Sequence, residues 1–415
     1  MLDNTGTRQL AYIVTINEIK PIEGKDRVEC AVVGGWTIMV RKDQFKPGDL
    51  GIYFEIDSKV PETEPFAFLE SKHYRIKTQK YSLKDVDGNK CGQFWSQGLL
   101  MAAEDFGWTL YQDGDGQSYI HDAEKNISMP EGYFLTETFG VTYAVEEDNK
   151  RKANSEDKYK KMAQRNSKLF SHQPFRWLMR RTWGKKLLFV FFGNKKDQKN
   201  TWPEWVKKTD EERIQNMPWI LNNKEPWIVT EKIDGTSTTF SLKRGKRGKY
   251  HFYICSRNVV FDKPDKKCFY ETNVYTEMAE KYDIENKLKN LLETNDLFSD
   301  ADWITLQGET YGPGIQKRDY SMPEHCFMGF NLISSDLGRL NSVVSKGLLE
   351  PIGIPWVPIV DENYILPDTV EELLNVATDK SMIDGDMREG LVFRSQDGTQ
   401  SFKAVSNEFL IKYHN

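Results

Sequence analysis

Short apolar runs separated by turn residues fill the first third of this 415-residue chain. Residues 11–16, 28–33 and 36–40 are rich in β-branched and aromatic side chains, and a Gly34-Gly35 pair separates the last two runs. Such runs predict β-strands, and the two-glycine gap predicts a hairpin. Because short strands at this spacing are typical of small barrels, residues 1–147 are predicted to form an OB-type β-barrel domain, a fold that often contacts nucleic acid.

Charge is distributed unevenly along the chain. The formal net charge is only −5, yet residues 150–199 contain 16 Lys and Arg against 3 Asp and Glu. We therefore interpret residues 148–200 as a basic, aromatic-rich linker. Its alternating cations and aromatics, as around Trp177 and Trp183, fit a nucleic-acid surface, a helix at a membrane surface, or a linker anchored on a neighbouring domain. The sequence leaves these three interpretations open.

Residues 201–415 predict a mixed α/β domain, so the chain as a whole is expected to be α+β. Thr209 and Glu212 have the spacing of a capping box, which predicts that a helix begins there. Residues 284–297 carry apolar side chains at helical spacing, and residues 371–377 form a further predicted helix.

The cysteines and the apolar runs indicate the compartment. The five cysteines are scattered without a C-x-x-C pair, which favours free thiols in a reducing environment and argues against a structural zinc. The longest apolar run, residues 187–192, is too short to span a bilayer, and the first residues lack the order of a signal peptide. We expect a soluble, cytoplasmic protein without stable membrane association.

Lys232 stands out because of its setting. The apolar run 227–230 reads as a buried strand, and Lys232, Asp234 and Gly235 follow it as K-x-D-G. A strand end holds the amine rigidly, and Asp234 points the same way because strand side chains alternate. Such a pair suits attack on a nucleotide phosphorus beside a metal ion, with nearby cations lowering the amine pKa from about 10.4. A surface turn is the simpler alternative.

Further stretches downstream carry side chains that a nucleotidyl-transfer site requires. They are Arg257 for phosphate or ribose, Glu309 between glycines, the aromatic stretch from Phe327 to Phe330, and Glu389 and Lys403 on later strands. Taken singly, each has an ordinary structural explanation as a surface Arg, a turn Glu, a core Phe or an edge-strand Lys. Their order along the chain is more informative than any one of them.

The order K-x-D-G, S-R-N, a glycine-flanked Glu, F-x-x-F, E-G-L-V-F-R and S-F-K resembles the motif series of the covalent nucleotidyltransferases, the polynucleotide ligases and mRNA capping enzymes. Within that superfamily the chain is most similar to ATP-dependent RNA ligases. An OB domain ahead of the transferase domain resembles the Deinococcus-type RNA ligase family. The resemblance implies that residues 201–415 form a nucleotidyltransferase (ATP-grasp-like ligase) domain.

The resemblance also implies roles for the residues that match the motifs. Lys232 would be the nucleophile that carries AMP, Glu231 would read the adenine edge, and Phe327 would stack on the base. Arg257 and Glu309 would fix ribose and phosphate, and Lys403 would contact the α-phosphate. A hydrated Mg²⁺ or Mn²⁺ would be held by three carboxylates: Asp234, Glu309 and Glu389. Some RNA ligases have a second lysine where this chain has Val405, which raises the question whether Lys412 assists Lys403.

These observations predict an ATP-dependent RNA ligase that joins RNA 3′-OH and 5′-phosphate ends through lysyl-AMP and adenylated RNA, at nicks or breaks in repair. We expect it to act as a monomer on RNA and ATP. Three rivals remain: a DNA ligase, a capping guanylyltransferase that uses GTP, and a non-catalytic RNA-binding protein that keeps the fold.

Overall fold

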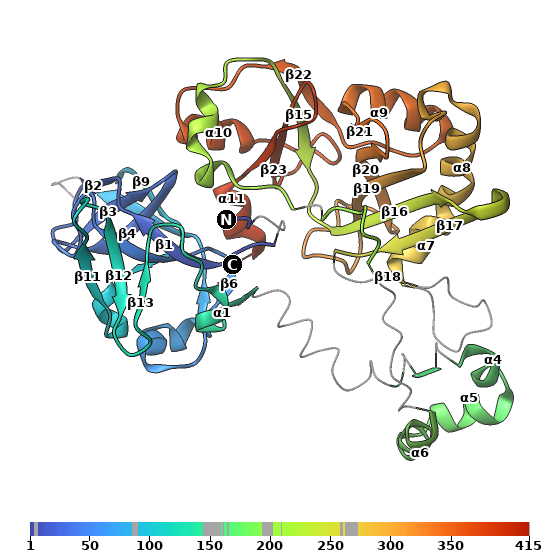
Figure 1. Ribbon diagram of the computed structural model, residues 1–415, viewed down its shortest axis with the longest axis horizontal. Helices are drawn as coiled ribbons and strands as arrows, with labels where there is room; N and C mark the ends of the chain where they lie inside the picture. Colours follow the sequence, from blue (N-terminus) through green and yellow to red (C-terminus); the bar gives the residue numbers. More distant parts are fainter. Residues whose placement is uncertain are drawn as a thin grey trace.

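Two domains and a separate helical segment make up the computed structural model (Figure 1). The structure describes residues 1–3, 7–84, 90–143, 159, 162–163, 166–192, 202–208, 210–257, 260–261 and 273–414. The N-terminal domain ends near Tyr143, and the C-terminal domain follows the helical segment.

The N-terminal domain is built from short antiparallel sheets. Strands β1, β5 and β10 form one sheet, β2, β3 and β4 a second, and β14, β6 and β7 a third. Strands β3 and β4 form the hairpin expected around the two glycines, with Val33 opposite Trp36. The strands are β1 Ala11–Thr15, β2 Glu18–Pro21, β3 Val28–Val33, β4 Trp36–Arg41, β5 Leu50–Phe54, β6 Ser58–Lys59, β7 Arg75–Ile76, β8 Gln79–Lys84, β9 Lys90–Ser96, β10 Leu99–Met101, β11 Thr109–Gln112, β12 Ser118–Asp122, β13 Ile127–Met129 and β14 Thr142–Tyr143; the helices are η1 Glu64–Lys72, η2 Ala103–Phe106 and α1 Thr136–Phe139.

Aromatic side chains fill the core of this domain. Trp36 and Tyr53 are buried and their rings lie 5.6 Å apart. Their burial assigns both residues to the core of the domain. An apolar interior of this size is the main stabilising contribution in a small β-domain.

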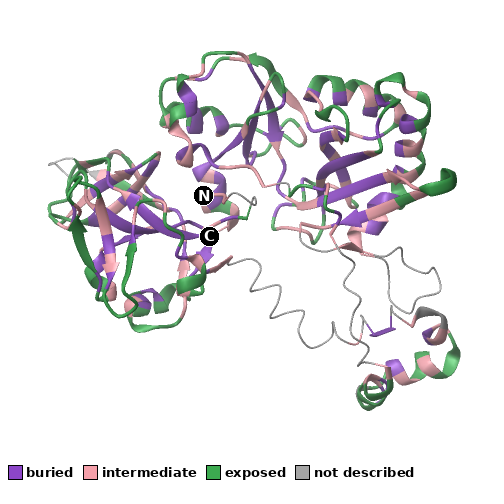
Figure 2. Ribbon diagram, in the orientation of Figure 1, coloured by how far each residue is buried: buried purple, intermediate pink, exposed green. Residues whose placement is uncertain are grey.

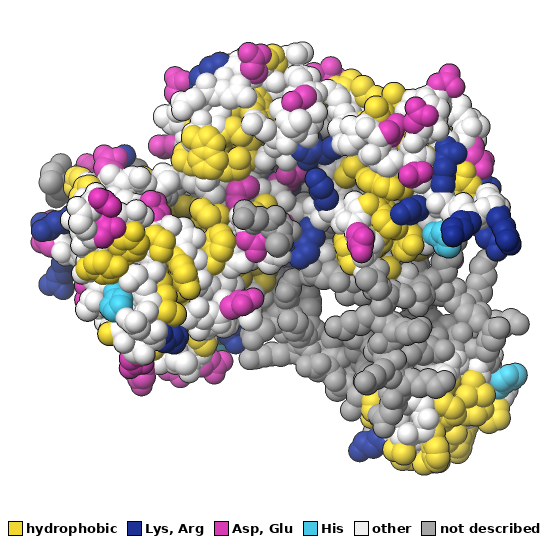
Figure 3. Space-filling model, viewed as in Figure 1, with side chains coloured by type: hydrophobic (Ala, Val, Ile, Leu, Met, Phe, Trp, Pro, Cys, Tyr) yellow, Lys and Arg dark blue, Asp and Glu magenta, His cyan; other side chains and the backbone are white. Residues whose placement is uncertain are grey.

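The helical segment consists of α4 Ser167–Phe170, α5 Gln173–Met179 and α6 Thr182–Phe192. Its own small core contains Phe170, Met179 and Leu188. Hydrophobic side chains also gather on its surface (Figure 3), where Trp177 and Trp183 are about half exposed. Among the described residues, no helix is long and apolar enough to cross a bilayer. The three interpretations of this basic segment stay predictions.

Two antiparallel sheets form the C-terminal domain. One has the order β22-β15-β23-β24, and the other has the order β18-β17-β16-β19-β20-β21. The strands are β15 Trp227–Lys232, β16 Thr236–Arg244, β17 Tyr250–Cys255, β18 Val260–Phe261, β19 Trp303–Tyr311, β20 Cys326–Ser334, β21 Gly338–Arg339, β22 Ile359–Tyr364, β23 Gly390–Ser395 and β24 Ser401–Val405. The helices are η3 Ile214–Asn216, η4 Pro218–Asn222, η5 Lys246–Gly248, α7 Val274–Lys281, α8 Ile284–Thr294, η6 Asp296–Phe298, α9 Ser342–Leu349, η7 Glu350–Ile352, α10 Val370–Ala377, α11 Asn407–Phe409 and the π-helical turn η8 Leu410–His414.

Each sheet of the C-terminal domain has its own core, and buried residues line the strands in Figure 2. Helix α8 covers the larger sheet and buries Ile284, Leu288, Leu291 and Leu292, which agrees with the helical spacing of its apolar residues. Helix α10 belongs to the core of the smaller sheet.

The helix expected after Thr209 does not form. Thr209 lies outside the described residues, and the residues after it are irregular until the short η3 turn. Arg213 instead makes a parallel bridge to Lys403 on β24, and the backbone N–H of Lys403 donates to the carbonyl of Glu212 at 2.7 Å. Pairing with a distant strand therefore replaces the local helix.

The two domains are joined by specific contacts. The backbone N–H of Gly35 donates to the carbonyl of Gln215 at 2.7 Å, and the Gln97 side-chain amide donates to Asn407 Oδ1 at 2.8 Å. Val405 and Leu410 of the C-terminal domain complete one hydrophobic cluster of the N-terminal domain. The C-terminal turn is thus packed against the OB-type domain.

Candidate active site

A cavity of about 790 Å³ lies where the two sheets of the C-terminal domain approach each other. Its volume is within the usual range for small-molecule sites. The residues that line it include Asp57, Tyr143, Asp210, Arg213, Glu231, Lys232, Asp234, Arg257, Glu309, Phe330, Glu389, Arg394, Lys403 and His414. Residues of both domains therefore contribute to its walls.

Lys232 ends β15 and points at the carboxylate of Glu389, which lies just before the paired strand β23. In the register of β15 and β23, Lys232 lies opposite Gly390, which brings the preceding Glu389 beside it. Lys232 Nζ donates to Glu389 Oε2 at 2.7 Å. Strand pairing thus brings together two residues that lie 157 positions apart.

The carboxylates around Lys232 keep its amine protonated. Burial lowers the pKa of Lys232, but Glu389, Glu309 and Asp234 outweigh burial, so the pKa lies above its ordinary value. The lowered pKa predicted for Lys232 depends on a divalent cation and on neighbouring lysines. The nearest charged groups in the protein itself are acidic, so activation of the amine requires that their charge be neutralised.

Asp234 and Gly235 make a tight connection between β15 and β16. The Asp234 N–H donates to Tyr320 Oη at 2.7 Å. A Cβ on Gly235 would lie only 2.3 Å from the carbonyl oxygen of Thr310, so this position excludes any larger residue. The glycine therefore serves the close approach of β19 to this connection.

Two acidic side chains in the cavity, Glu309 and Asp234, are poorly compensated. Burial, together with Glu389 and Asp234, raises the pKa of Glu309 to about 8 even though Lys232 opposes the shift. Asp234 Oδ2 is buried without a hydrogen-bond partner, and its Oδ1 lies 3.5 Å from His414 Nε2. Crowded carboxylates with an unpaired buried oxygen fit a divalent cation.

The described residues contain no group of three acidic, histidine or cysteine side chains placed to ligate one ion directly. An ion held here would therefore keep several water ligands, as Mg²⁺ commonly does. The hydrated ion that the sequence resemblance implies for Asp234, Glu309 and Glu389 stays a prediction.

Cations form the other side of the cavity. Lys403 Nζ donates to Asp210 Oδ1 at 2.7 Å, and Arg257 Nη2 donates to Asp210 Oδ2 at 2.8 Å. Burial lowers the pKa of Lys403 to about 8, although Asp210 opposes the shift. Asp210 was not singled out in the sequence, because nothing local marks a partner that lies 193 positions from Lys403.

The aromatic assignment requires a correction. Phe327 is fully buried and packs against Phe240 with a ring distance of 5.2 Å, so it does not reach the cavity. Phe330, in the same predicted stretch, lines the cavity instead. Side chains three residues apart on a strand point to opposite faces, so only one of the two has access.

Glu231 lies in the cavity wall with its carboxylate already bonded. Ser381 Oγ donates to Oε1, and the N–H of Met382 donates to Oε2 at 2.8 Å. Burial raises the pKa of Glu231. A carboxylate has further lone pairs, so a bound amino group remains a feasible additional donor.

Two other positions near the C-terminus differ in their surroundings. Lys412 is about half exposed, and its Nζ lies 3.0 Å from Asp386 Oδ2, so Lys412 is not part of the cavity wall. His414, two residues later, does line the cavity. The π-helical turn η8 positions His414, and no sequence pattern indicated that turn.

Comparisons with known proteins identify the type of each domain. Residues 225–414 match the family model described as RNA ligase, and residues 10–103 match a model described as OB-fold domain. The C-terminal domain is an RNA ligase domain. The fold class and the RNA ligase prediction are thereby confirmed, and we call the two parts the OB domain and the ligase domain. No curated protein sequence matches the chain.

Solved structures of the Naegleria gruberi RNA ligase resemble the whole chain. A mutant of that enzyme with ATP and Mn is 26% identical, with a TM-score of 0.67 over 98% of this chain and 100% of that chain. Another mutant, with AMP and Mn, is also 26% identical, with a TM-score of 0.67 over 98% and 99% of the two chains. The form with PPi is 26% identical, with a TM-score of 0.66 over the same shares.

Proposed function

We propose that this RNA ligase uses ATP and joins RNA 3′-OH and 5′-phosphate ends through an AMP carried on Lys232. The observation that carries the proposal is the cavity in which Lys232 Nζ lies 2.7 Å from Glu389, with Asp234 and Glu309 beside it and Lys403 on the facing wall. The complexes of the Naegleria gruberi enzyme with ATP, AMP and PPi support it.

In the first step, Lys232 Nζ forms a bond to the α-phosphorus of ATP, and the bond to the pyrophosphate oxygen breaks. The amine must first lose its proton, and Glu389 is positioned to accept it. Lys403 and Arg257 face the cavity as cations that stabilise charge on the phosphate oxygens. A divalent ion at Asp234, Glu309 and Glu389 would neutralise these carboxylates and so lower the pKa of the amine.

In the second step, an oxygen of the RNA 5′-phosphate attacks the same phosphorus, and the bond between phosphorus and Lys232 Nζ breaks. In the third step, the RNA 3′-oxygen attacks the 5′-phosphorus, AMP leaves, and the strand is sealed. Each step moves negative charge across phosphoryl oxygens, so the same cationic wall serves all three.

Two further residues of the cavity wall could bind the adenine base. We propose that Phe330 stacks on adenine and that Glu231 accepts its amino group, because both line the cavity near Lys232. Stacking on one aromatic face is tolerant of base identity, so Glu231 would supply the selectivity.

The proposal also covers the subfamily of the enzyme, its oligomeric state and its location in the cell. The OB domain precedes the ligase domain, which supports a place among the Deinococcus-type RNA ligases. One chain supplies every group named in the mechanism, which supports action as a monomer. Free thiols at Cys30, Cys255 and Cys326 support a cytoplasmic location, where repair of nicked or broken RNA would take place.

Transfer of label from α-labelled ATP to the protein tests this proposal. Wild-type enzyme should become labelled in a denaturing gel, and Lys232→Ala and Lys232→Arg should not, since an arginine cannot deprotonate. Labelling of the Lys232→Ala protein would contradict the assignment. Adding nicked duplexes with RNA or DNA at the 3′-OH side, and replacing ATP by GTP, separates an RNA ligase from a DNA ligase or a capping enzyme.

A further inference from the structure

Asp210 lies where the OB domain meets the ligase domain, and three cations surround its carboxylate. Arg8 Nε donates to Oδ2 at 2.9 Å, Arg257 Nη2 donates to Oδ2 at 2.8 Å, and Lys403 Nζ donates to Oδ1 at 2.7 Å. Arg257 and Lys403 line the catalytic cavity, whereas Arg8 belongs to the OB domain. One carboxylate therefore connects both domains with the cationic wall.

The carboxylate of Asp210 carries a negative charge throughout the physiological pH range. Burial raises the pKa of Asp210, but Lys403, Arg8 and Arg257 outweigh burial and hold the pKa well below its usual value. Without this charge, the buried cations Arg8 and Lys403 and the partly exposed Arg257 would repel one another at close range. The present positions of Lys403 and Arg257 thus depend on Asp210.

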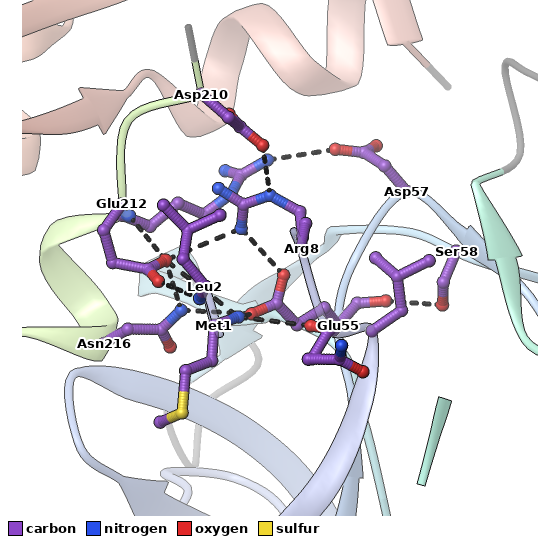
Figure 4. A network of polar contacts seen from close by, with 12 residues as sticks. Met1, Leu2, Arg8, Glu55, Asp57, Ser58, Asp210, Glu212 and Asn216 are labelled. Atoms are coloured by element: carbon purple, nitrogen blue, oxygen red, sulfur yellow. Dashed lines mark hydrogen bonds and ion pairs between the residues drawn. The ribbon is translucent and has the colours of Figure 1, made fainter. Parts of the chain in front are cut away.

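Arg8 is itself fixed by several partners (Figure 4). Its Nη1 donates to Glu55 Oε2 of the OB domain at 3.0 Å, and its Nη2 donates to the carbonyl of Glu211 at 3.0 Å. Glu212 Oε1 lies 3.6 Å from the same Nη1. A planar guanidinium held on several sides has little freedom to follow a displaced carboxylate. Arg8 therefore anchors Asp210 to the OB domain.

We propose that Asp210 is a positioning residue for transfer of AMP to Lys232. It holds Lys403 and Arg257 in the cavity wall and, through Arg8, makes their placement depend on how the OB domain sits on the ligase domain. This inference rests on the proposed function, in which Lys403 and Arg257 act on the nucleotide.

Glu212 supplies a matched control for Asp210. The two residues lie in the same segment, both are near Arg8, and both side chains are 11% exposed. Among the contacts the structure describes, the Glu212 carboxylate meets Arg8, Asn216, the Met1 amino group and the backbone N–H groups of Leu2 and Arg213, but neither Lys403 nor Arg257. Asp210→Asn and Glu212→Gln thus remove the same charge next to the same arginine, and only the first takes the negative charge away from Lys403 and Arg257.

The test measures the rate of lysyl-AMP formation with ATP and Mn²⁺ across pH, on the full chain. A displacement of about 1 Å at a reacting group costs about 100-fold in rate, and we expect a loss of this order for Asp210→Asn and near wild-type rates for Glu212→Gln. Among the charged groups with the largest influence on the pKa of Lys403, Asp210 raises it, whereas Arg8, Arg213 and Lys232 lower it. The alkaline limb of the pH profile should therefore move to lower pH in Asp210→Asn only.

The outcomes separate the inference from the function. No lysyl-AMP in the wild type would overturn the proposed function. Labelling in the wild type, with Asp210→Asn equal to Glu212→Gln in rate and pH profile, would overturn the role of Asp210 alone. If Asp210→Asn does not fold, as judged by thermal melting, Arg8→Lys takes its place: it keeps the charge beside Glu55 but shortens the reach to Asp210. A folded Arg8→Lys enzyme with the wild-type rate and pH profile would overturn the coupling.

Discussion

Phe327 and Phe330 offer a sharp test, because two phenylalanines three residues apart have opposite surroundings. Phe327 is fully buried among Phe240, Tyr282 and Gly308, whereas Phe330 is partly exposed at the cavity. We therefore expect Phe327→Ala to lower stability without changing the affinity of the folded enzyme for ATP. Phe330→Ala should weaken ATP binding at little cost in stability.

The magnitudes follow from these surroundings. Removing a fully buried phenylalanine costs about 3–5 kcal/mol in unfolding free energy. Loss of one aromatic face for a base costs about 1–3 kcal/mol, which corresponds to a KM for ATP about 5-fold to 150-fold higher. The unfolding midpoint in urea and the KM for ATP in lysyl-AMP formation measure the two effects separately.

The two variants also serve as controls for each other. Phe327→Ala should leave the KM for ATP unchanged, and Phe330→Ala should leave the stability nearly unchanged. The reasoning is refuted if Phe330→Ala keeps the wild-type KM while Phe327→Ala raises it in enzyme that remains folded. That result would return base stacking to Phe327 and would require a different packing of β20.

Three further predictions concern the acidic side of the cavity. Glu389→Gln removes the negative charge and the proton-accepting base 2.7 Å from Lys232 Nζ, so the rate of lysyl-AMP formation should fall by about 100-fold to 1000-fold; a loss below fivefold would contradict this role. Gly235→Ala places a Cβ 2.3 Å from the Thr310 carbonyl and should lower the unfolding free energy by about 1–3 kcal/mol, as measured in urea; Gly114→Ala, in open space, is the control. Because the pKa of Glu309 is raised to about 8, its folded form binds a proton that the unfolded form releases near pH 4.5. Its contribution is thus complete at acid pH and is lost as the pH rises through 8. The melting temperature of metal-free wild type should therefore fall more between pH 5 and 8.5 than that of Glu309→Gln, and Mn²⁺ should reduce the difference; parallel curves would contradict this account.

The sequence predicted the parts of the site that depend on local pattern. An apolar strand followed by K-x-D-G places Lys232 at a strand end, and E-G-L-V-F-R places Glu389 at the start of the neighbouring strand. The residues within each motif lie only a few positions apart, so strand geometry alone determines which way their side chains point. The pairing of those two strands then brings them together.

The parts that the sequence did not predict depend on distant contacts. Asp210 has partners 202, 47 and 193 positions away, and its segment shows a helical capping pattern that pairing with β24 overrides. Phe327 and Phe330 are equally apolar, so only the packing of β20 decides which faces the cavity. His414 lies in a π-helical turn, which has no recognisable pattern.

Mass spectrometry of the protein after incubation with ATP and Mn²⁺ tests the central claim most directly. The account predicts that one peptide, the one containing Lys232, gains the mass of an AMP moiety, and that the gain is lost in acid, which cleaves phosphoramidates, and on adding pyrophosphate. AMP on any other residue, or no adduct on enzyme that seals RNA in an ATP-dependent manner, would contradict it.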